Sequence, residues 1–152
     1  MNTLHRVQEL PISIEQAWEF FSSPKNLKHI TPPYMGFDIL SKNIDHMEEG
    51  QRIEYLIRPL FNFSMKWVSK ISKVKPMDMF VDEQLKGPYK MWHHSHYFEP
   101  IPGGVRMTDL VKYQLPFGIF GKLFHGLVKK KLEDIFDYRI LALKSKFGTL
   151  EH

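Results

Sequence analysis

The feature that most constrains this chain is a long amphipathic segment near its C-terminal end, residues 117–147. Apolar side chains recur in it at steps of three and four, which places them in one stripe of an α-helix. The stripe comprises Phe120, Phe124, Leu127, Val128, Leu132, Ile135, Phe136, Ile140, Leu143 and Phe147. Gly148 follows, where a helix is expected to stop. At ~1.5 Å per residue this helix is long, so it needs a large apolar surface to pack against.

The chain before this segment has the pattern of a β-rich structure. Its runs alternate apolar and polar residues and are bounded by turn residues, which is typical of strands. We expect strands at 4–10, 37–41, 52–58, 63–74, 79–85, 89–99 and 105–115. Short connections predict antiparallel hairpins. We therefore predict an α+β fold in which a curved antiparallel sheet of about seven strands wraps around the C-terminal helix.

Two short helices are predicted between the first and second strands. Ser13 and Gln16 have the spacing of a capping box, and Ser23-Pro24 can start a second helix. The Pro32-Pro33 pair must end that helix, because a residue that precedes proline is disfavoured in helical conformation.

Length and composition predict one domain at residues 1–148, with 149–152 as a last native residue and a tag remnant. The sequence has no cysteine, which excludes disulfides and thiolate chemistry. Its N-terminal residues lack the apolar run of a signal peptide, and no apolar span is long enough for a membrane helix. We expect a cytoplasmic protein.

The net charge of +4 is concentrated between Lys112 and Lys146, a stretch that contains eight basic and three acidic residues. A basic helix face is usually solvated, and no nucleic-acid motif accompanies it, so we expect no nucleic-acid partner. Gly118 and Gly121 lack the strand-to-helix setting of a nucleotide-binding loop, and we expect no cofactor.

Several motifs of the chain, in order, closely resemble those of one superfamily of ligand-binding proteins. The matching stretches are residues 20–27 (FFSSPKNL), 30–33 (ITPP), 80–84 (FVDEQ), 87–89 (GPY), 92–98 (WHHSHYF) and 107–109 (MTD). They resemble bacterial members of the superfamily of START domains, polyketide cyclases and the birch pollen allergen (SRPBCC). The resemblance implies a helix-grip fold with a cavity between sheet and helix. Relatives carry lipids, hormones or quinones, or cyclise polyketides, and some similar domains are associated with nucleotide-sugar-epimerase-like proteins.

Alternation along the predicted strands brings polar residues to the face that carries the large aromatic side chains. If Trp67 and Trp92 point towards the helix, residues two and four positions away point there too. The candidate ligand-binding residues are Tyr55, Trp67, Ser69, Phe80, Asp82, Gln84, Trp92, His94, His96, Phe98, Met107, Asp109, Val111 and, on the helix, Phe136.

The presence of polar side chains on this inward-facing surface requires an explanation, because burying unpaired polar groups costs several kcal/mol. They could form a hydrogen-bond network that holds the sheet, or orient a ligand in an apolar pocket. His94 or His96, oriented by Asp109, could instead move a proton in catalysis. Two histidines and an aspartate also have the ligand types for zinc or iron, but we expect no metal.

The stretch 116–126 is apolar, rich in glycine and followed by three lysines. It could be a plain connector between the last strand and the helix. Alternatively, Phe117, Phe120 and Phe124 could form a flexible gate over the cavity, with peripheral membrane contact through the rings and lysines.

The sequence therefore favours a protein that binds or carries a small, mainly apolar ligand such as a lipid, a quinone or a polyketide-like molecule. An enzyme of the cyclase or dehydratase kind, using His and Asp as acid–base groups, is the alternative. A partner domain of an epimerase-like protein is the third interpretation.

Overall fold

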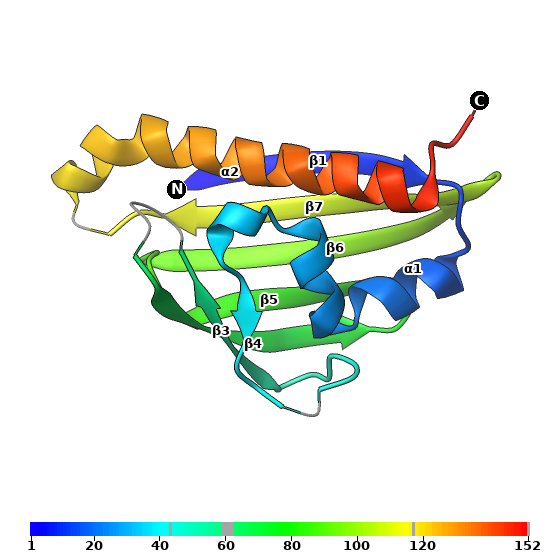
Figure 1. Ribbon diagram of the computed structural model, residues 1–152, viewed down its shortest axis with the longest axis horizontal. Coiled ribbons are helices and arrows are strands. Elements are labelled where there is room, and N and C mark those ends of the chain that lie inside the picture. The colour runs from blue at the N-terminus through cyan, green and yellow to red at the C-terminus, as the bar shows by residue number, and fades with distance from the viewer. Residues whose placement is uncertain (43, 59–62, 117, 152) are drawn as a thin grey trace.

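The computed structural model describes residues 1–152 except 43, 59–62, 117 and 152, and it has the predicted helix-grip architecture (Figure 1). The strands are β1 (Asn2–Leu10), β2 (Asp38–Ile39), β3 (Arg52–Ile57), β4 (Met65–Lys75), β5 (Met79–Lys86), β6 (Met91–Ile101) and β7 (Gly104–Gln114). The helices are α1 (Ile14–Phe21), the 3-10 helices η1 (Pro24–Ile30) and η2 (Pro33–Met35), and α2 (Ile119–Phe147).

The seven strands form one antiparallel sheet in the order β1-β7-β6-β5-β4-β3-β2. Among the strands that the structure describes, β1 and β7 alone pair across a long stretch of sequence, and the other neighbours in the sheet are consecutive along the chain. β4 shifts register against β5 at Val68/Ser69 and again at Ile71/Lys73. Such irregularities bend a strand, and the sheet curves around α2 and the short helices (Figure 1).

The helices after β1 begin where the sequence predicts. Ser13 and Gln16 form both hydrogen bonds of a capping box at the start of α1. The second segment is a 3-10 helix, and its N-cap residue Ser23 makes no side-chain capping bond. It ends at Thr31, which is extended because Pro32 follows. The short helix η2 was not predicted.

α2 runs from Ile119 to Phe147, so residues 119–126 form its first two turns instead of a separate connector. At its far end Gly148 has a φ of 91° and donates its N–H to the carbonyl of Lys144, which is the predicted helix stop. Within the part of the chain that the structure describes, no helix is long and apolar enough to cross a membrane.

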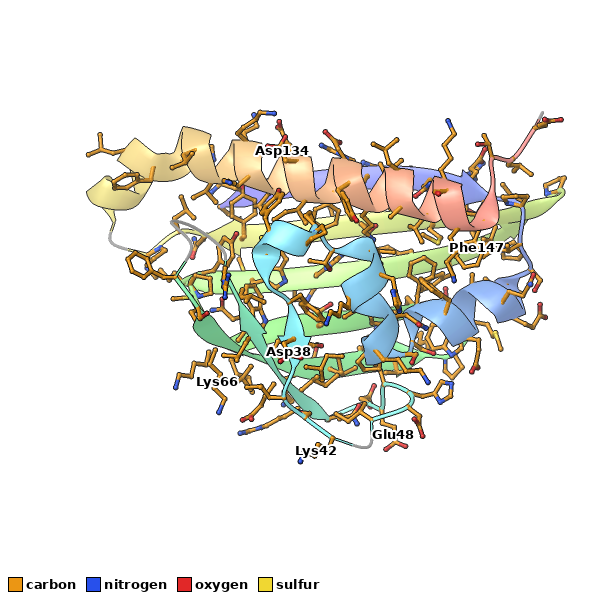
Figure 2. The ribbon with its side chains drawn as sticks, viewed as in Figure 1. Asp38, Lys42, Glu48, Lys66, Asp134 and Phe147 are labelled. Atoms are coloured by element: carbon orange, nitrogen blue, oxygen red, sulfur yellow. The ribbon has the colours of Figure 1, made fainter. Side chains whose placement is uncertain are left out.

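Side chains occupy the space between α2 and the sheet (Figure 2), and their packing differs along the helix. Near the C-terminal end of α2, side chains from β1, α1, β6, β7 and α2 pack together. We call this region the packed end, and it comprises Leu10, Ala17, Phe20, Phe21, Phe98, Val105, Met107 and Leu143, with Trp18 packed against them. A second cluster, around Trp92, Val111, Leu132 and Phe136, lies under the N-terminal half of α2.

Candidate functional site

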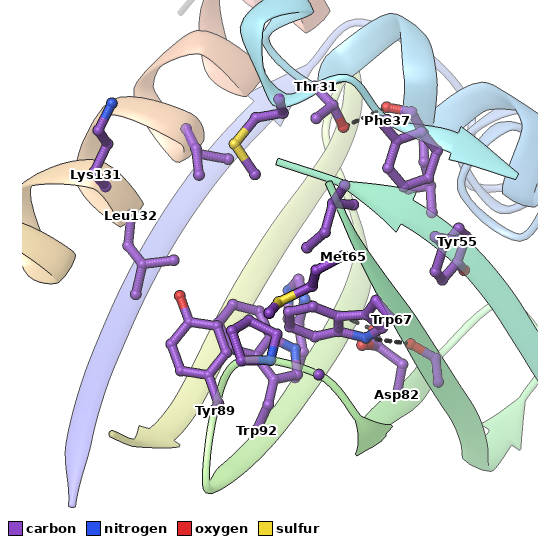
Figure 3. A pocket seen from close by; sticks show the side chains of 18 of the residues that line it. Thr31, Phe37, Tyr55, Met65, Trp67, Asp82, Tyr89, Trp92, Lys131 and Leu132 are labelled. Carbon is purple, nitrogen blue, oxygen red and sulfur yellow. Dashed lines mark hydrogen bonds and ion pairs between the residues drawn. The ribbon is translucent and has the colours of Figure 1, made fainter. Parts of the chain in front are cut away.

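A cavity of about 710 Å³ lies between the N-terminal half of α2 and the curved sheet (Figure 3). This volume falls within the range of about 300–1,000 Å³ typical of small-molecule sites. We call this region the hollow end. Its lining side chains come from η1, η2, β3 to β6, the β5–β6 turn and α2.

One wall of the cavity is made of three aromatic rings. The rings of Trp67 and Trp92 meet edge to face at 5.3 Å between centroids, and Tyr89 lies 5.7 Å from Trp67 and 4.9 Å from Trp92. The indole N–H of Trp67 donates to the hydroxyl of Ser69 at 2.9 Å, so its polar atom is satisfied within β4. The wall therefore presents apolar ring surface to whatever occupies the cavity.

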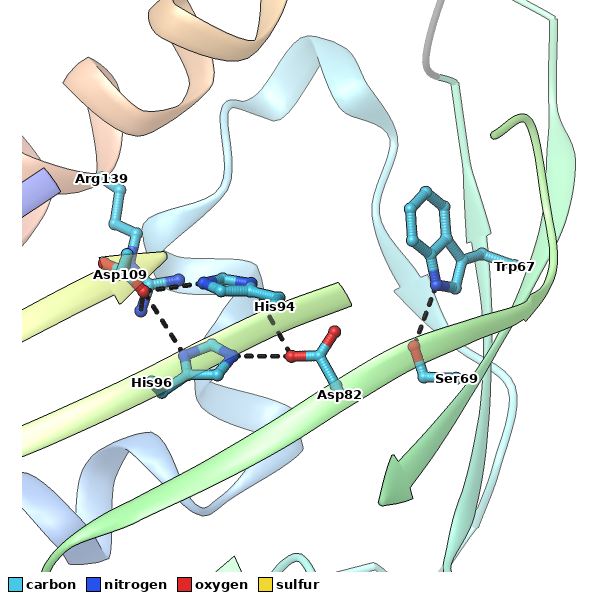
Figure 4. Close-up of polar contacts among 7 residues, drawn as sticks. All are labelled: Trp67, Ser69, Asp82, His94, His96, Asp109 and Arg139. Atoms are coloured by element: carbon cyan, nitrogen blue, oxygen red, sulfur yellow. Dashed lines mark hydrogen bonds and ion pairs between the residues drawn. The ribbon is translucent and has the colours of Figure 1, made fainter. Parts of the chain in front are cut away.

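Four polar side chains from three neighbouring strands meet at the inner wall of the hollow end (Figure 4). His94 and His96 lie on one face of β6, and their rings stack at 3.6 Å. Nε2 of His94 lies 2.8 Å from Asp109 on β7, and Nε2 of His96 lies 2.6 Å from Asp82 on β5. Each histidine thus makes one direct hydrogen bond to a carboxylate of a neighbouring strand.

The register of the strands explains these contacts. His94 is opposite Asp82 and His96 is opposite Asp109 across the two ladders, so each imidazole bonds to the carboxylate diagonal to it. The contacts to the opposite carboxylates are longer, 3.7 Å from Nδ1 of His94 to Asp82 and 3.4 Å from Nδ1 of His96 to Asp109. The four side chains form one connected network.

Arg139 of α2 completes this network, and sequence reasoning missed it. Its guanidinium lies 3.3 Å from the carboxylate of Asp109 and over the rings of Phe21 and Phe136, and only 9% of the residue is exposed. A signal was present: Arg139 lies three residues after Phe136 and four before Leu143, on the inward stripe of α2. A charge on that stripe requires a buried partner.

The network determines which of its members carry charge. Burial alone would raise the pKa of Asp109, but the charge of Arg139 and the hydrogen bond from His94 hold it well below its usual value. Burial also opposes ionisation of Asp82, yet the nearby imidazole of His94 and the hydrogen bond from His96 lower its pKa. Both carboxyl groups are therefore ionised at neutral pH.

The two histidines respond in opposite directions. Burial lowers the pKa of His94, and the charge of His96 lowers it further. Burial has the same tendency at His96, but hydrogen bonds to Asp109 and Asp82 outweigh it and raise the pKa of His96. These directions favour an arrangement in which Asp82, Asp109, His96 and Arg139 are charged around a neutral His94, and the charges of that arrangement sum to zero.

Asp82, His94 and His96 also offer three potential metal-ligand atoms within 4.8 Å of one another. These are suitable donor types for zinc. However, Nε2 of each imidazole is already bonded to a carboxylate, so a metal would have to replace part of the hydrogen-bond network.

Most residues expected from the sequence at the ligand site line the cavity. These are Tyr55, Trp67, Ser69, Phe80, Asp82, Trp92, His94, His96 and Phe136. The side-chain amide of Gln84 instead bonds both backbone groups of Tyr89 and closes the β5–β6 turn. Phe98 and Met107 belong to the packed end, Val111 is buried in the second cluster, and Asp109 lies behind the histidines.

The residues expected to form a gate lie near the start of α2. Phe117 and the side chain of Phe120 are outside the described part of the structure. Phe124 is exposed and lines the cavity. Phe63, before β4, was not anticipated, yet it also lines the cavity and is 72% exposed. We call the place where these exposed lining residues, Phe63 and Phe124, lie the opening of the cavity. Lys131 of α2 also lines the cavity, and it lies over the ring of Tyr34 in η2, 5.1 Å from its centroid.

Comparison with known families and with curated proteins gives no match. Solved structures share the fold. CV1439 from Chromobacterium violaceum has a TM-score of 0.72 at 12% identity, with 98% of this chain and 99% of that chain covered. TTHA0849 from Thermus thermophilus has a TM-score of 0.70 at 17% identity, with 95% of each chain covered. A nucleoside-diphosphate sugar epimerase from Corynebacterium glutamicum has a TM-score of 0.66 at 21% identity, covering 92% of this chain but only 28% of that chain.

Proposed function

We propose that this protein binds or carries a small, mainly apolar molecule in its cavity, as SRPBCC proteins do. The observation that carries the proposal is the cavity of about 710 Å³, walled by Trp67, Tyr89 and Trp92 and provided with a few convergent polar groups. This combination is the usual construction of a small-molecule site.

Packing energetics support the proposal. Protein interiors are normally filled to the density of organic crystals, and unfilled apolar space forfeits dispersion contacts. The packed end of this protein follows that rule, whereas the hollow end leaves large rings around open space. An apolar occupant would restore those contacts.

Saturable binding of Nile red, an uncharged apolar dye, tests the proposal. Leu132 is buried and lines the cavity, whereas Leu141 on the same helix is 65% exposed and does not. Leu132→Trp should fill part of the cavity and weaken dye binding by about tenfold or more, on the scale of a lost side-chain burial. Leu141→Trp should leave the affinity unchanged. Absence of saturable binding to the unaltered protein, or equal effects of the two substitutions, would contradict the proposal.

The His94–Asp109 pair supports a second candidate, acid–base catalysis of a cyclisation or dehydration. A carboxylate that orients a histidine at the wall of a pocket is a common arrangement for proton transfer. The test is turnover of hydroxy-carbonyl compounds, followed as loss of water by mass spectrometry. Conversion that His94→Gln abolishes while Nile red still binds would establish catalysis, and binding without conversion would favour the carrier.

We propose further that the opening of the cavity makes peripheral contact with membranes. Phe63, Leu123, Phe124 and Leu127 are exposed there or on the adjoining turns of α2. Lys122 and Lys129 are exposed on the same part of the helix. Apolar rings beside lysines suit the interface of an anionic bilayer, and such contact would let a ligand pass directly between lipid and cavity.

The third interpretation, association with an epimerase-like protein, is supported by the structural similarity to part of a nucleoside-diphosphate sugar epimerase. Co-purification of such an enzyme with the tagged protein from its own host tests it. A partner lost on Phe124→Ser but kept on Leu141→Ser would use the cavity opening, whereas recovery of the chain alone would remove this interpretation.

A further inference from the structure

We infer that the polar wall of the cavity selects uncharged molecules that donate a hydrogen bond, namely alcohols or phenols, over matched ethers and carboxylates. This inference rests on the proposed function, since it specifies which apolar ligands the cavity prefers. It follows from the hydrogen-bonding state of Asp82 and His94, the two groups of the network that face the cavity and can still accept.

Asp82 has acceptor capacity beyond the hydrogen bonds that it accepts from His96 and from the side chain of Trp92. Its Oδ2 accepts from Nε2 of His96 at 2.6 Å, while the other oxygen points away from both imidazoles (Figure 4). A carboxylate has about four acceptor positions. The side chain remains 16% exposed, and the residue lines the cavity.

His94 presents a second acceptor beside it. Because Asp109 is ionised, Nε2 of His94 must carry the hydrogen that it donates to Asp109 at 2.8 Å. In the neutral imidazole, Nδ1 then has a lone pair and no hydrogen. This Nδ1 lies 3.7 Å from Oδ2 of Asp82. Both atoms are hydrogen-bond acceptors, so neither brings a proton to the contact. A ligand hydroxyl that reached them would supply it.

The charge balance disfavours an anionic ligand at this position. Arg139 and His96 already compensate Asp109 and Asp82, so a carboxylate would add uncompensated negative charge next to Asp82 at low dielectric. Lys131 also lines the cavity, but it lies on α2 across the cavity from Asp82 (Figure 3). An ether oxygen can only accept, and would face two acceptors.

Three fluorescent probes of one shape test the selection: hydroxypyrene, methoxypyrene and pyrene carboxylate, titrated into the unaltered protein at neutral pH. Hydroxypyrene should bind about tenfold or more tightly than methoxypyrene, the scale of one hydrogen bond to a charged group. Pyrene carboxylate should bind more weakly still. Energy transfer from Trp67 and Trp92 reports occupancy of the cavity.

Two substitutions locate the effect. Asp82→Asn removes the charged acceptor and should reduce the preference for hydroxypyrene several-fold. Phe136→Leu, at another residue that lines the cavity, should weaken all three probes similarly and keep their order. If Asp82→Asn does not fold, the three-probe comparison on the unaltered protein still decides.

Equal affinities for the three probes, or tightest binding of methoxypyrene or the carboxylate, would overturn the inference and leave the proposed function standing. Binding of none of them, with no Nile red binding either, would overturn both. A preference for hydroxypyrene that Asp82→Asn leaves unchanged would also overturn the assignment to Asp82.

Discussion

The packed end and the hollow end use the same kinds of residue for different purposes. At the packed end, Trp18 lies edge to face with Phe98, at 5.6 Å between centroids. At the hollow end, Trp67 and Trp92 make an edge-to-face pair at 5.3 Å, but their free surfaces border the cavity. Aromatic content alone therefore does not distinguish core from site. The difference between core and site is whether side chains of α1 or α2 cover a ring, as at the packed end, or leave it at the edge of the cavity.

The polar network lies where the two ends meet. The ring of His96 stacks on Phe80 at 4.0 Å, and Arg139 lies over Phe21 of the packed end and Phe136 of the hollow end. A charge-balanced network can be buried against the packed end while it presents acceptors to the cavity. This arrangement combines a structural role with a role in ligand orientation.

Asp109→Asn, in the network between the two ends, is expected to lower the free energy of unfolding most. The substitution leaves Arg139 as a buried cation without its carboxylate partner, and breaking a buried pair in this way costs about 3–5 kcal/mol. The free energy of unfolding from guanidinium denaturation measures it.

The matched control is Asp137→Asn. Asp137 lies 3.7 Å from Arg6, but its side chain is 62% exposed, so the change should stay within about 0.5 kcal/mol. If Asp109→Asn were as mild as this control, the network would not hold the two ends together.

Alanine substitutions of two leucines on α2 test most directly whether the two ends are packed differently. Leu143 is buried at the packed end, and Leu143→Ala should cost about 2–5 kcal/mol through the lost burial and the new cavity. Leu132 already borders open space, so Leu132→Ala should cost clearly less, nearer the transfer cost alone. Denaturation of both variants gives the two values, and equal costs would mean that the ends are packed alike.

The pH dependence of stability tests whether the pKa values of the two histidines in the network are shifted in opposite directions. The raised pKa of His96 contributes stability that is present below its unfolded value, ~6.5, and is lost as pH rises through the folded value. The lowered pKa of His94 has the opposite sign and reduces stability as pH falls below ~6.5. The two effects oppose each other in the unaltered protein.

His94→Gln should therefore make the protein gain stability, relative to the unaltered chain, as pH falls from above 7 towards about 5. Denaturation at a series of pH values measures this slope. Leu143→Ala serves as the control, because it should lower stability without changing the slope. Asp82 and Asp109 have lowered pKa values in the folded protein. Every form that retains both carboxylates should therefore lose stability below about pH 4, as these groups become protonated.

The smallest effects are expected at the cavity opening. Phe124→Ser and Lys129→Glu should each reduce flotation with anionic vesicles a few-fold while leaving stability nearly unchanged, because both side chains are exposed. Binding should weaken as salt rises, since surface attraction is screened beyond about 8 Å at physiological salt. Leu141→Ser is the control on the same helix. Absence of flotation at low salt would remove the membrane proposal but not the cavity proposal.

The sequence predicted what depends on strand alternation. The order of the elements and the inward faces of β3 to β7, including the face that the two histidines share with Asp82 and Asp109, follow from a period of two and short hairpins. It did not predict contacts set by packing between distant elements. Arg139 reaches Asp109 only because α2 crosses the sheet at that point, and Phe63 reaches the cavity only because the sheet curves.

Gln84 shows a different limit. Alternation predicted an inward side chain at a ligand site, but the side-chain amide of Gln84 is used by the local turn at Gly87, Pro88 and Tyr89. Turn backbones leave unpaired polar groups that a nearby amide can satisfy. The start of α2 was ambiguous for a related reason, because glycines within 118–126 suggest a bend, whereas the apolar stripe continues through them.

The difference between the two ends can be measured most directly by NMR, because the three tryptophans report on both. Trp18 lies at the packed end, whereas Trp67 and Trp92 line the cavity. Titration with hydroxypyrene should shift the indole N–H resonances of Trp67 and Trp92 in a saturable manner and leave that of Trp18 nearly unchanged. Unshifted indole signals for Trp67 and Trp92, or an equal shift at Trp18, would contradict a ligand-binding cavity confined to the hollow end.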